Sequence, residues 1–147
     1  MAQYLLGENT LIHLCYSDTS SRKWLDSVSG AELYTSVIAI AAARETISAL
    51  SKSPKEQARQ LLNLQQMIAR LKAGGMTVLP LEQDIADEWV SWRWEPLKVV
   101  RDGLAEDAPQ DTRMIIATAA ARGLCLVEPL EDYHATLQAH GIMVLSL

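Results

Sequence analysis

The chain has 147 residues, which is the length of one domain with a core of its own. Hydrophobic residues make up 49% and charged residues 21%, and these values argue against a disordered chain. The formal net charge of -5 gives no general attraction to a phosphate backbone, so nucleic-acid binding would need a local basic patch. We expect a single globular domain covering residues 1–147.

The two cysteines, Cys15 and Cys125, lie in separate apolar segments with no second cysteine near either of them. This pattern predicts buried, reduced thiols and argues against a disulfide scaffold or a zinc site. The longest apolar run, residues 37–43, is too short to span a bilayer, and no basic segment precedes an apolar run at the N-terminus. We therefore expect a cytoplasmic protein that does not contact membranes.

Strands and helices are predicted to alternate along the chain. The segment 4–12 predicts a buried strand that leads through a polar turn at Gly7 and Glu8 into a helix capped by Asn9. Further strands are expected at 32–35, 76–79, 124–127 and 142–145, and helices at 21–28, 37–49, 54–73, 83–94, 109–122 and 132–139. This order indicates an α/β fold, a three-layer α/β/α sandwich with a mainly parallel sheet of about five strands.

Turn residues support several of these boundaries. Ser36 is a predicted N-cap, Pro54 and Pro109 suit the first turn of a helix, and Gly123 suits the end of one. Residues 95–108 show no periodicity, and a stretch of this length in a compact domain is typical of an ordered surface loop or lid. Ligands of open α/β sheets bind outside the carboxyl ends of the strands, so the turn after residue 6 is the expected floor of a site.

Four segments of the chain resemble the PIN domain, and within it the VapC-type toxins of bacterial toxin–antitoxin pairs. Residues 4–12 are similar to the family's opening Leu-Leu-Asp-Thr-Asn-x-Leu-Ile, and residues 35–40 to its Thr/Ile-Ser-Val-Ile-Thr-x segment. Residues 115–127 resemble its Asp-x-x-Ile-Ala-Ala-Thr-Ala helix with the following strand, and residues 131–145 resemble its Asp-Phe and Gly-Val-x-Val-Leu ending. The resemblance implies a magnesium- or manganese-dependent ribonuclease with an acidic cluster at the carboxyl edge of the sheet.

The family's four acidic positions carry no carboxylate in this chain. They fall on Gly7, Ala42, Thr112 and Leu130, whose side chains are absent, apolar or at best weak neutral ligands. Neighbouring acids are the candidates to replace them: Glu8, Glu45, Asp111, and Glu131 or Asp132. Glu45 lies one helical turn beyond residue 42 and shares its face, whereas Asp111 is about 100° around its helix from residue 112.

Two hypotheses follow for the function. In the first, the chain is a PIN-like protein that has lost metal-dependent catalysis, needs no cofactor, and acts as a homodimer by binding an antitoxin-like protein partner or RNA. In the alternative, it is an active ribonuclease of a toxin–antitoxin system that binds Mg or Mn through Glu8, Glu45 and Asp111, with Glu131 completing the catalytic set. The sequence leaves open whether the protein is an enzyme.

Two further groups of side chains bear on binding. Trp89 and Trp92 share a predicted helix face and are expected to be core residues or dimer-interface anchors. Basic residues near the predicted helix starts, Arg113 among them, would be available to bind an anion or an RNA phosphate at the site.

Overall fold

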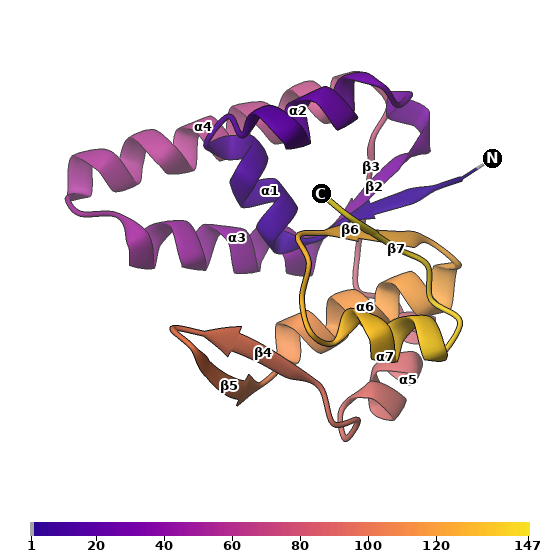
Figure 1. The fold of residues 1–147 in the computed structure, drawn as a ribbon. Helices are drawn as coiled ribbons and strands as arrows, with labels where there is room; N and C mark the ends of the chain where they lie inside the picture. The colour runs from indigo at the N-terminus through magenta and orange to yellow at the C-terminus, as the bar shows by residue number, and fades with distance from the viewer. Residues whose placement is uncertain (1) are drawn as a thin grey trace.

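A five-stranded parallel sheet forms the centre of the computed structural model, which describes residues 2–147 (Figure 1). The strands lie in the order β3 (Thr77–Leu79), β2 (Leu33–Ser36), β1 (Tyr4–Leu6), β6 (Cys125–Glu128) and β7 (Val144–Ser146). Each neighbouring pair is parallel. The carboxyl ends of all five strands therefore meet at one edge of the sheet, as the alternation of strands and helices predicted.

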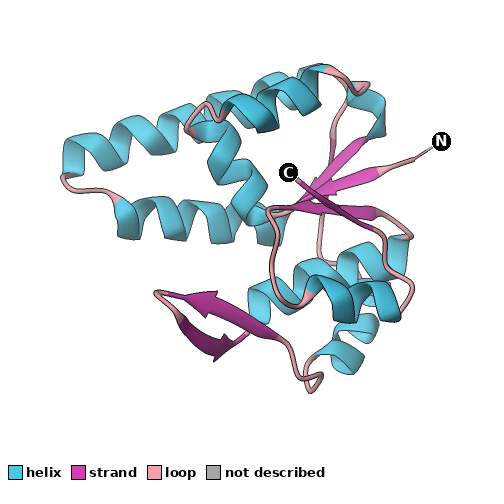
Figure 2. Ribbon diagram, in the orientation of Figure 1, coloured by secondary structure: helices cyan, strands magenta, loops and turns pink. Residues whose placement is uncertain are grey.

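Helices cover both faces of this sheet, which confirms the predicted three-layer α/β/α sandwich (Figure 2). One layer contains α1 (Glu8–Cys15), α2 (Thr19–Asp26), α3 (Val37–Leu50) and α4 (Pro54–Ala73); the other contains α5 (Gln83–Trp92), α6 (Gln110–Arg122) and α7 (His134–Ala139). A short 3-10 turn, Gly30–Glu32, leads into β2. Within residues 2–147, no helix combines the length and the apolar character that crossing a membrane requires.

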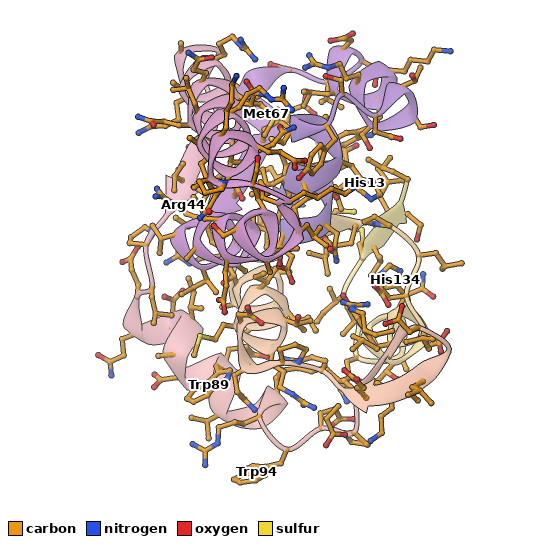
Figure 3. All side chains as sticks on the ribbon, turned by 90° about the vertical axis from the view of Figure 1, so that its left-hand side faces the viewer. His13, Arg44, Met67, Trp89, Trp94 and His134 are labelled. Atoms are coloured by element: carbon orange, nitrogen blue, oxygen red, sulfur yellow. The ribbon has the colours of Figure 1, made fainter. Side chains whose placement is uncertain are left out.

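The core is built on the two central strands, β1 and β6, which bury side chains on both of their faces. Leu5, Leu6 and Val127 have no exposed surface, because helices pack above and below them. Both cysteines are buried free thiols, as predicted. Trp92 is a core residue with 4% of its surface exposed, and Trp89, labelled in Figure 3, is partly buried against the same core.

Most of the predicted helix ends are confirmed. The Ser36 hydroxyl accepts a hydrogen bond from the Ala39 N–H at 3.0 Å, and Gly123 ends α6 in the left-handed conformation with φ of 62°. The start of α2 was predicted wrongly. Its N-cap is Asp18, whose carboxylate accepts the Ser21 N–H at 2.9 Å, so this helix begins before the residue that was expected to cap it.

The segment 95–108, expected to be an irregular surface loop or lid, contains a β-hairpin. Its strands are β4 (Lys98–Arg101) and β5 (Leu104–Asp107), which pair only with each other. Asp102 and Gly103 form the turn between them with φ of 51° and 78°. A two-residue hairpin turn of this kind needs positive φ at both positions, and an Asp-Gly pair is among the sequences that accept it.

A buried arginine fixes the base of the hairpin. Arg113 is 5% exposed, and its guanidinium donates to the backbone carbonyls of Trp92, Glu95 and Ala108 at 2.7, 2.6 and 3.0 Å. These hydrogen bonds join the start of α6 to both ends of the hairpin segment. The prediction that Arg113 is available to bind an anion is wrong, because the side chain is committed to the protein backbone.

Candidate functional site

The carboxyl ends of β1 and β6 bring two chain segments together at the edge of the sheet. Leu6 is in register with Val127, and the Gly7 N–H donates to the Val127 carbonyl at 3.1 Å. Gly7 and Glu128, the next residues of the two segments, are therefore neighbours. The turn after residue 6 is the floor of the site, as predicted, and α1 begins directly above it.

Glu128 is the central residue of this site and was not among the predicted ones. Its side chain, with the residue 3% exposed, points under the start of α1. Oε1 accepts the Thr10 N–H at 3.2 Å, and Oε2 accepts from the Asn9 side-chain amide at 3.0 Å. The Thr10 N–H is one of the backbone donors that a helix leaves unpaired at its first turn. Glu128 thus caps α1 from a different strand.

This capping differs from the prediction. Asn9 is not the N-cap of α1, because it lies inside the helix and donates its side-chain amide to Glu128 instead. The N-cap is Gly7, which has no side chain with which to accept a hydrogen bond. The helix therefore depends on a carboxyl group supplied from outside its own segment.

Gly7 and Glu128 are sterically dependent on each other. A Cβ atom added to Gly7 would lie 2.6 Å from Glu128 Cγ and would overlap the carboxyl carbon and Oε1. Real Cβ atoms do not approach other heavy atoms this closely, so Glu128 in this position requires glycine at residue 7. The PIN resemblance expects an aspartate at this position. A carboxyl group is present in that space, but it comes from the adjacent strand.

The carboxyl of Glu128 is neutral near pH 7. Burial, and to a smaller extent the charge of the nearby Glu8, raise its pKa to about 8, although the hydrogen bonds from Thr10 and Asn9 favour the ionised form. The pKa of Glu8 is also raised, first by burial and then by the charge of Asp111, while its contact with the Thr46 hydroxyl at 3.4 Å acts in the opposite direction. Two adjacent acids in this site therefore hold protons more tightly than acids in water.

The space between these residues is almost closed. The cavity has a volume of about 10 Å³, roughly the smallest that can hold one water molecule. Its polar lining consists of Glu8, Asn9, Arg101, Thr112, Glu128, Glu131 and Tyr133. Burial is also the main reason that the pKa of the Tyr133 hydroxyl is raised far above its ordinary value. A substrate has no room to enter this cavity as it stands.

The structure brings together only some of the predicted replacement acids. Glu8 and Glu131 line the cavity, and Glu131 pairs with Arg101 through an Nη1–Oε1 distance of 3.4 Å. The Asp111 carboxylate accepts the Thr112 N–H at 2.8 Å at the start of α6 and acts on Glu8 only through its charge. Glu45 on α3 is exposed and does not line the cavity.

The other three positions at which the family carries acids are residues 42, 112 and 130. Ala42 is buried in α3, and Thr112 lines the cavity with a neutral hydroxyl. Leu130 is 78% exposed at the surface, and Asp132 is exposed as well. The family's fourth acidic position therefore holds an apolar side chain that faces solvent.

The chain is similar in structure to chains of solved proteins from bacterial toxin–antitoxin systems. A chain of the DNA-bound VapBC from Salmonella typhimurium matches with a TM-score of 0.71 and 22% identity, over 99% of this chain and 98% of that one. FitAcB from Neisseria gonorrhoeae matches with a TM-score of 0.70 and 22% identity, over 98% and 97%. VapC20 from Mycobacterium tuberculosis, a sarcin-ricin loop cleaving toxin, matches with a TM-score of 0.63 and 10% identity, over 96% and 97%.

The chain has the PIN-domain fold. The matches extend over nearly the whole length of both chains, so no large element is added to the fold or missing from it. A scan against protein-family models and a search of curated protein sequences both found no match. The structural similarity therefore establishes the VapC-like PIN fold, and the chemistry of the site has to be argued from its own residues.

These residues do not fit the divalent metal ion that the PIN-domain resemblance implies. Magnesium and manganese take oxygen ligands, mostly from ionised carboxylates. Glu128 is protonated near neutral pH and both of its oxygens already accept hydrogen bonds, while Glu131 is paired with Arg101. Across residues 2–147, no three His, Cys, Asp or Glu side chains are grouped so that they would hold a metal.

Two residues of the site, Glu128 and Arg101, were not predicted from the sequence. Glu128 directly follows the apolar run Leu124–Val127, and an acid at the end of a predicted central strand is a recognisable signal for this edge of the sheet. Arg101 lies in the segment taken as an irregular loop. The Asp-Gly pair that follows it was the available signal for a hairpin, and a hairpin would have placed the arginine on a defined face.

Proposed function

We propose that this PIN-fold protein acts by binding a protein partner and does not cleave RNA with a metal ion. The observation that carries the proposal is the state of Glu128. Its carboxyl group occupies the space beside residue 7, is protonated near neutral pH, and uses both oxygens to hold α1. A neutral carboxyl group whose two oxygens each accept a hydrogen bond from the protein is a poor ligand for a hard cation.

The surface around the closed cavity suits a protein partner. Leu104 lies opposite Arg101 across the hairpin and is 67% exposed, and Leu130, next to Glu131, is 78% exposed. The contact between Arg101 and Glu131 joins the two segments that carry these leucines. Exposed apolar side chains with polar residues around them are typical of protein interaction sites.

The same surface is less suited to RNA. Nucleic-acid binding gains most of its free energy from lysine and arginine contacts with phosphates. The chain carries a formal charge of -5, and Arg101, the cation that lines the cavity, already faces Glu131. A phosphate would have to displace that pair and approach several acids. These features favour a protein over RNA as the ligand.

The comparisons add support for a partner of a particular kind. The similar structures include a toxin–antitoxin complex from Klebsiella pneumoniae, and VapBC from Salmonella typhimurium was solved bound to DNA. We infer that an antitoxin-like protein is the partner of this chain as well. Assembly as a homodimer stays a prediction, for which light scattering of the purified chain is the direct measurement.

The first experiment tests the absence of metal chemistry. Calorimetric titration with Mn²⁺ and incubation with structured RNA, in Mn²⁺ and in EDTA, should give no binding below millimolar concentrations and no metal-dependent cleavage. Tight Mn²⁺ binding together with cleavage that Glu8→Gln abolishes would overturn the proposal in favour of an active ribonuclease. The Glu8→Gln variant keeps the size and hydrogen-bonding ability of the side chain, so loss of folding would not imitate this result.

The second experiment tests the partner surface. A tagged chain is used to capture proteins from its host, and the captured partner is then produced separately and its affinity measured against two variants. Leu130→Glu should weaken the complex at least tenfold, because it places a charge on the apolar rim of the site. Met143→Glu is the matched control, since Met143 is 58% exposed but precedes β7 at the opposite edge of the sheet. Equal affinity of both variants would show that the partner binds elsewhere.

A further inference from the structure

The β4–β5 hairpin has one face directed at the site. Val99 and Arg101 are two residues apart in β4, so their side chains lie on the same face of the hairpin. Val99 is 3% exposed, and both residues line the small cavity beside Glu128. The buried valine therefore fixes the face that carries the arginine.

The guanidinium of Arg101 is held in a defined place by two contacts. Nη1 lies 3.4 Å from Glu131 Oε1 and donates to the Val100 carbonyl at 3.2 Å. The Arg101 side chain is 45% exposed and the Glu131 side chain 14%, so the acid is the more buried partner of the pair. The hairpin thereby places a positive charge in the lining of the cavity.

Acidic side chains outnumber basic ones in the lining of the cavity. Glu8, Glu128 and Glu131 line the cavity, and Arg101 is the one basic residue among the described residues that form its lining. Arg101 and Glu8 line the same cavity of about 10 Å³, so the guanidinium lies close to Glu8 as well as to Glu131.

We propose that Arg101 is the built-in cation of this site, and that the β4–β5 hairpin holds its guanidinium over Glu131 and beside Glu8 so that the acids are neutralised from within the chain. A divalent ion, which the PIN resemblance implies at this edge of the sheet, would bring positive charge to the same acids. The misfit between the residues and a metal then has a cause, since one arginine supplies the positive charge. The inference does not depend on which protein partner binds.

The attachment of the hairpin explains how the arginine is presented. Leu97 is fully buried, and the Ala108 N–H donates to its carbonyl at 2.9 Å, so both ends of the hairpin are fixed in the core. All four residues of β5 are exposed, and β5 pairs only with β4. The ends of the hairpin are therefore anchored in the core, while β5 is exposed to solvent along its whole length.

The test measures whether a divalent ion can replace the arginine. Melting temperatures of wild type, Arg101→Gln, Arg101→Lys and Lys98→Gln are compared in EDTA and in millimolar Mn²⁺. Lys98 is the matched control, because it lies in the same strand, on the opposite face, and pairs with Asp107. We expect Arg101→Gln alone to melt lower in EDTA and to regain at least half of that loss in Mn²⁺. Wild type and the other two variants should not respond to the ion.

A second measurement locates the ion. Mn²⁺ is paramagnetic and broadens the NMR signals of nearby protons, so it should broaden the ring signals of Tyr133 in Arg101→Gln and leave them sharp in wild type. Three results would overturn the inference: a melting temperature of Arg101→Gln equal to that of wild type in EDTA, no recovery in Mn²⁺, or equal recovery of Lys98→Gln. Broadening of the Tyr133 signals in wild type would also overturn it, since the arginine would then not exclude the ion.

Discussion

Replacement of Glu128 by glutamine should make the protein more stable, and the gain should grow with pH. Glutamine has nearly the same shape as glutamate, and its side-chain oxygen accepts the Thr10 N–H as the carboxyl does. Rotation of the Asn9 amide presents an oxygen to the new NH₂ group. The variant therefore keeps the capping of α1 and removes only the ability to ionise.

The size of the stability gain follows from the raised pKa of Glu128. The folded-state pKa of about 8 lies above the ordinary value of 4.5, so the folded protein retains a proton that the unfolded chain releases between these two values. Below pH 4.5 both states are protonated and the shift has no effect on stability. As the pH rises to about 8, the free energy of unfolding falls by about 5 kcal/mol, at about 1.4 kcal/mol for each pKa unit.

The assay is urea denaturation followed by tryptophan fluorescence, with wild type and variant compared at pH values of about 5, 7 and 9. The variant should gain about 1 kcal/mol or less at the lowest pH and about 4 to 5 kcal/mol at the highest. Glu106→Gln, which changes an exposed carboxylate on β5, should leave the stability unchanged at all three. A gain that is constant with pH would show that the pKa of Glu128 is not raised in the folded protein.

Three further substitutions test the packing around the site. Gly7→Ala should cost about 3 kcal/mol or more, because the new Cβ overlaps the Glu128 carboxyl, and calorimetry should show a smaller cost when Glu128→Ala is also present. Arg113→Met should cost about 3 kcal/mol in urea denaturation because it leaves three backbone carbonyls without their donor. Gly103→Ala should cost about 1 kcal/mol and speed hydrogen exchange in β4 and β5, because φ is positive at this residue.

The order of strands and helices could be predicted because each element is encoded locally. Buried parallel strands are short apolar runs bounded by polar or glycine turns, and the five runs found in this way are the five strands of the sheet. The hairpin was missed for the same reason. Every residue of β5 is exposed and only Val99 of β4 is buried, so no alternation of polar and apolar residues marks these strands. Its one local signal is the Asp102-Gly103 turn.

The site could be predicted in position but not in composition. The carboxyl edge of the sheet and the turn at Gly7 follow from the strand order, which local patterns establish. The partnership of Gly7 with Glu128 depends on the pairing of β1 with β6, two strands at opposite ends of the chain. Four acids are missing when each position of the chain is aligned with the same position of the family. Such an alignment does not reveal that the carboxyl group of Glu128 lies beside residue 7 in space.

The carboxyl group beside residue 7 comes from β6 and not from the residue that follows β1. This origin changes the ability of the site to bind a metal ion, although a carboxyl group is still present. A metal ligand needs an ionised oxygen with a free lone pair directed at the ion. Glu128 reaches the same space from below α1, where burial keeps it protonated and where the Thr10 N–H and the Asn9 amide already take its oxygens. The requirements of capping a buried helix start and of binding a divalent ion compete for the same two atoms. In this chain both carboxyl oxygens of Glu128 accept hydrogen bonds from residues of α1. The positive charge near the neighbouring acids comes from Arg101.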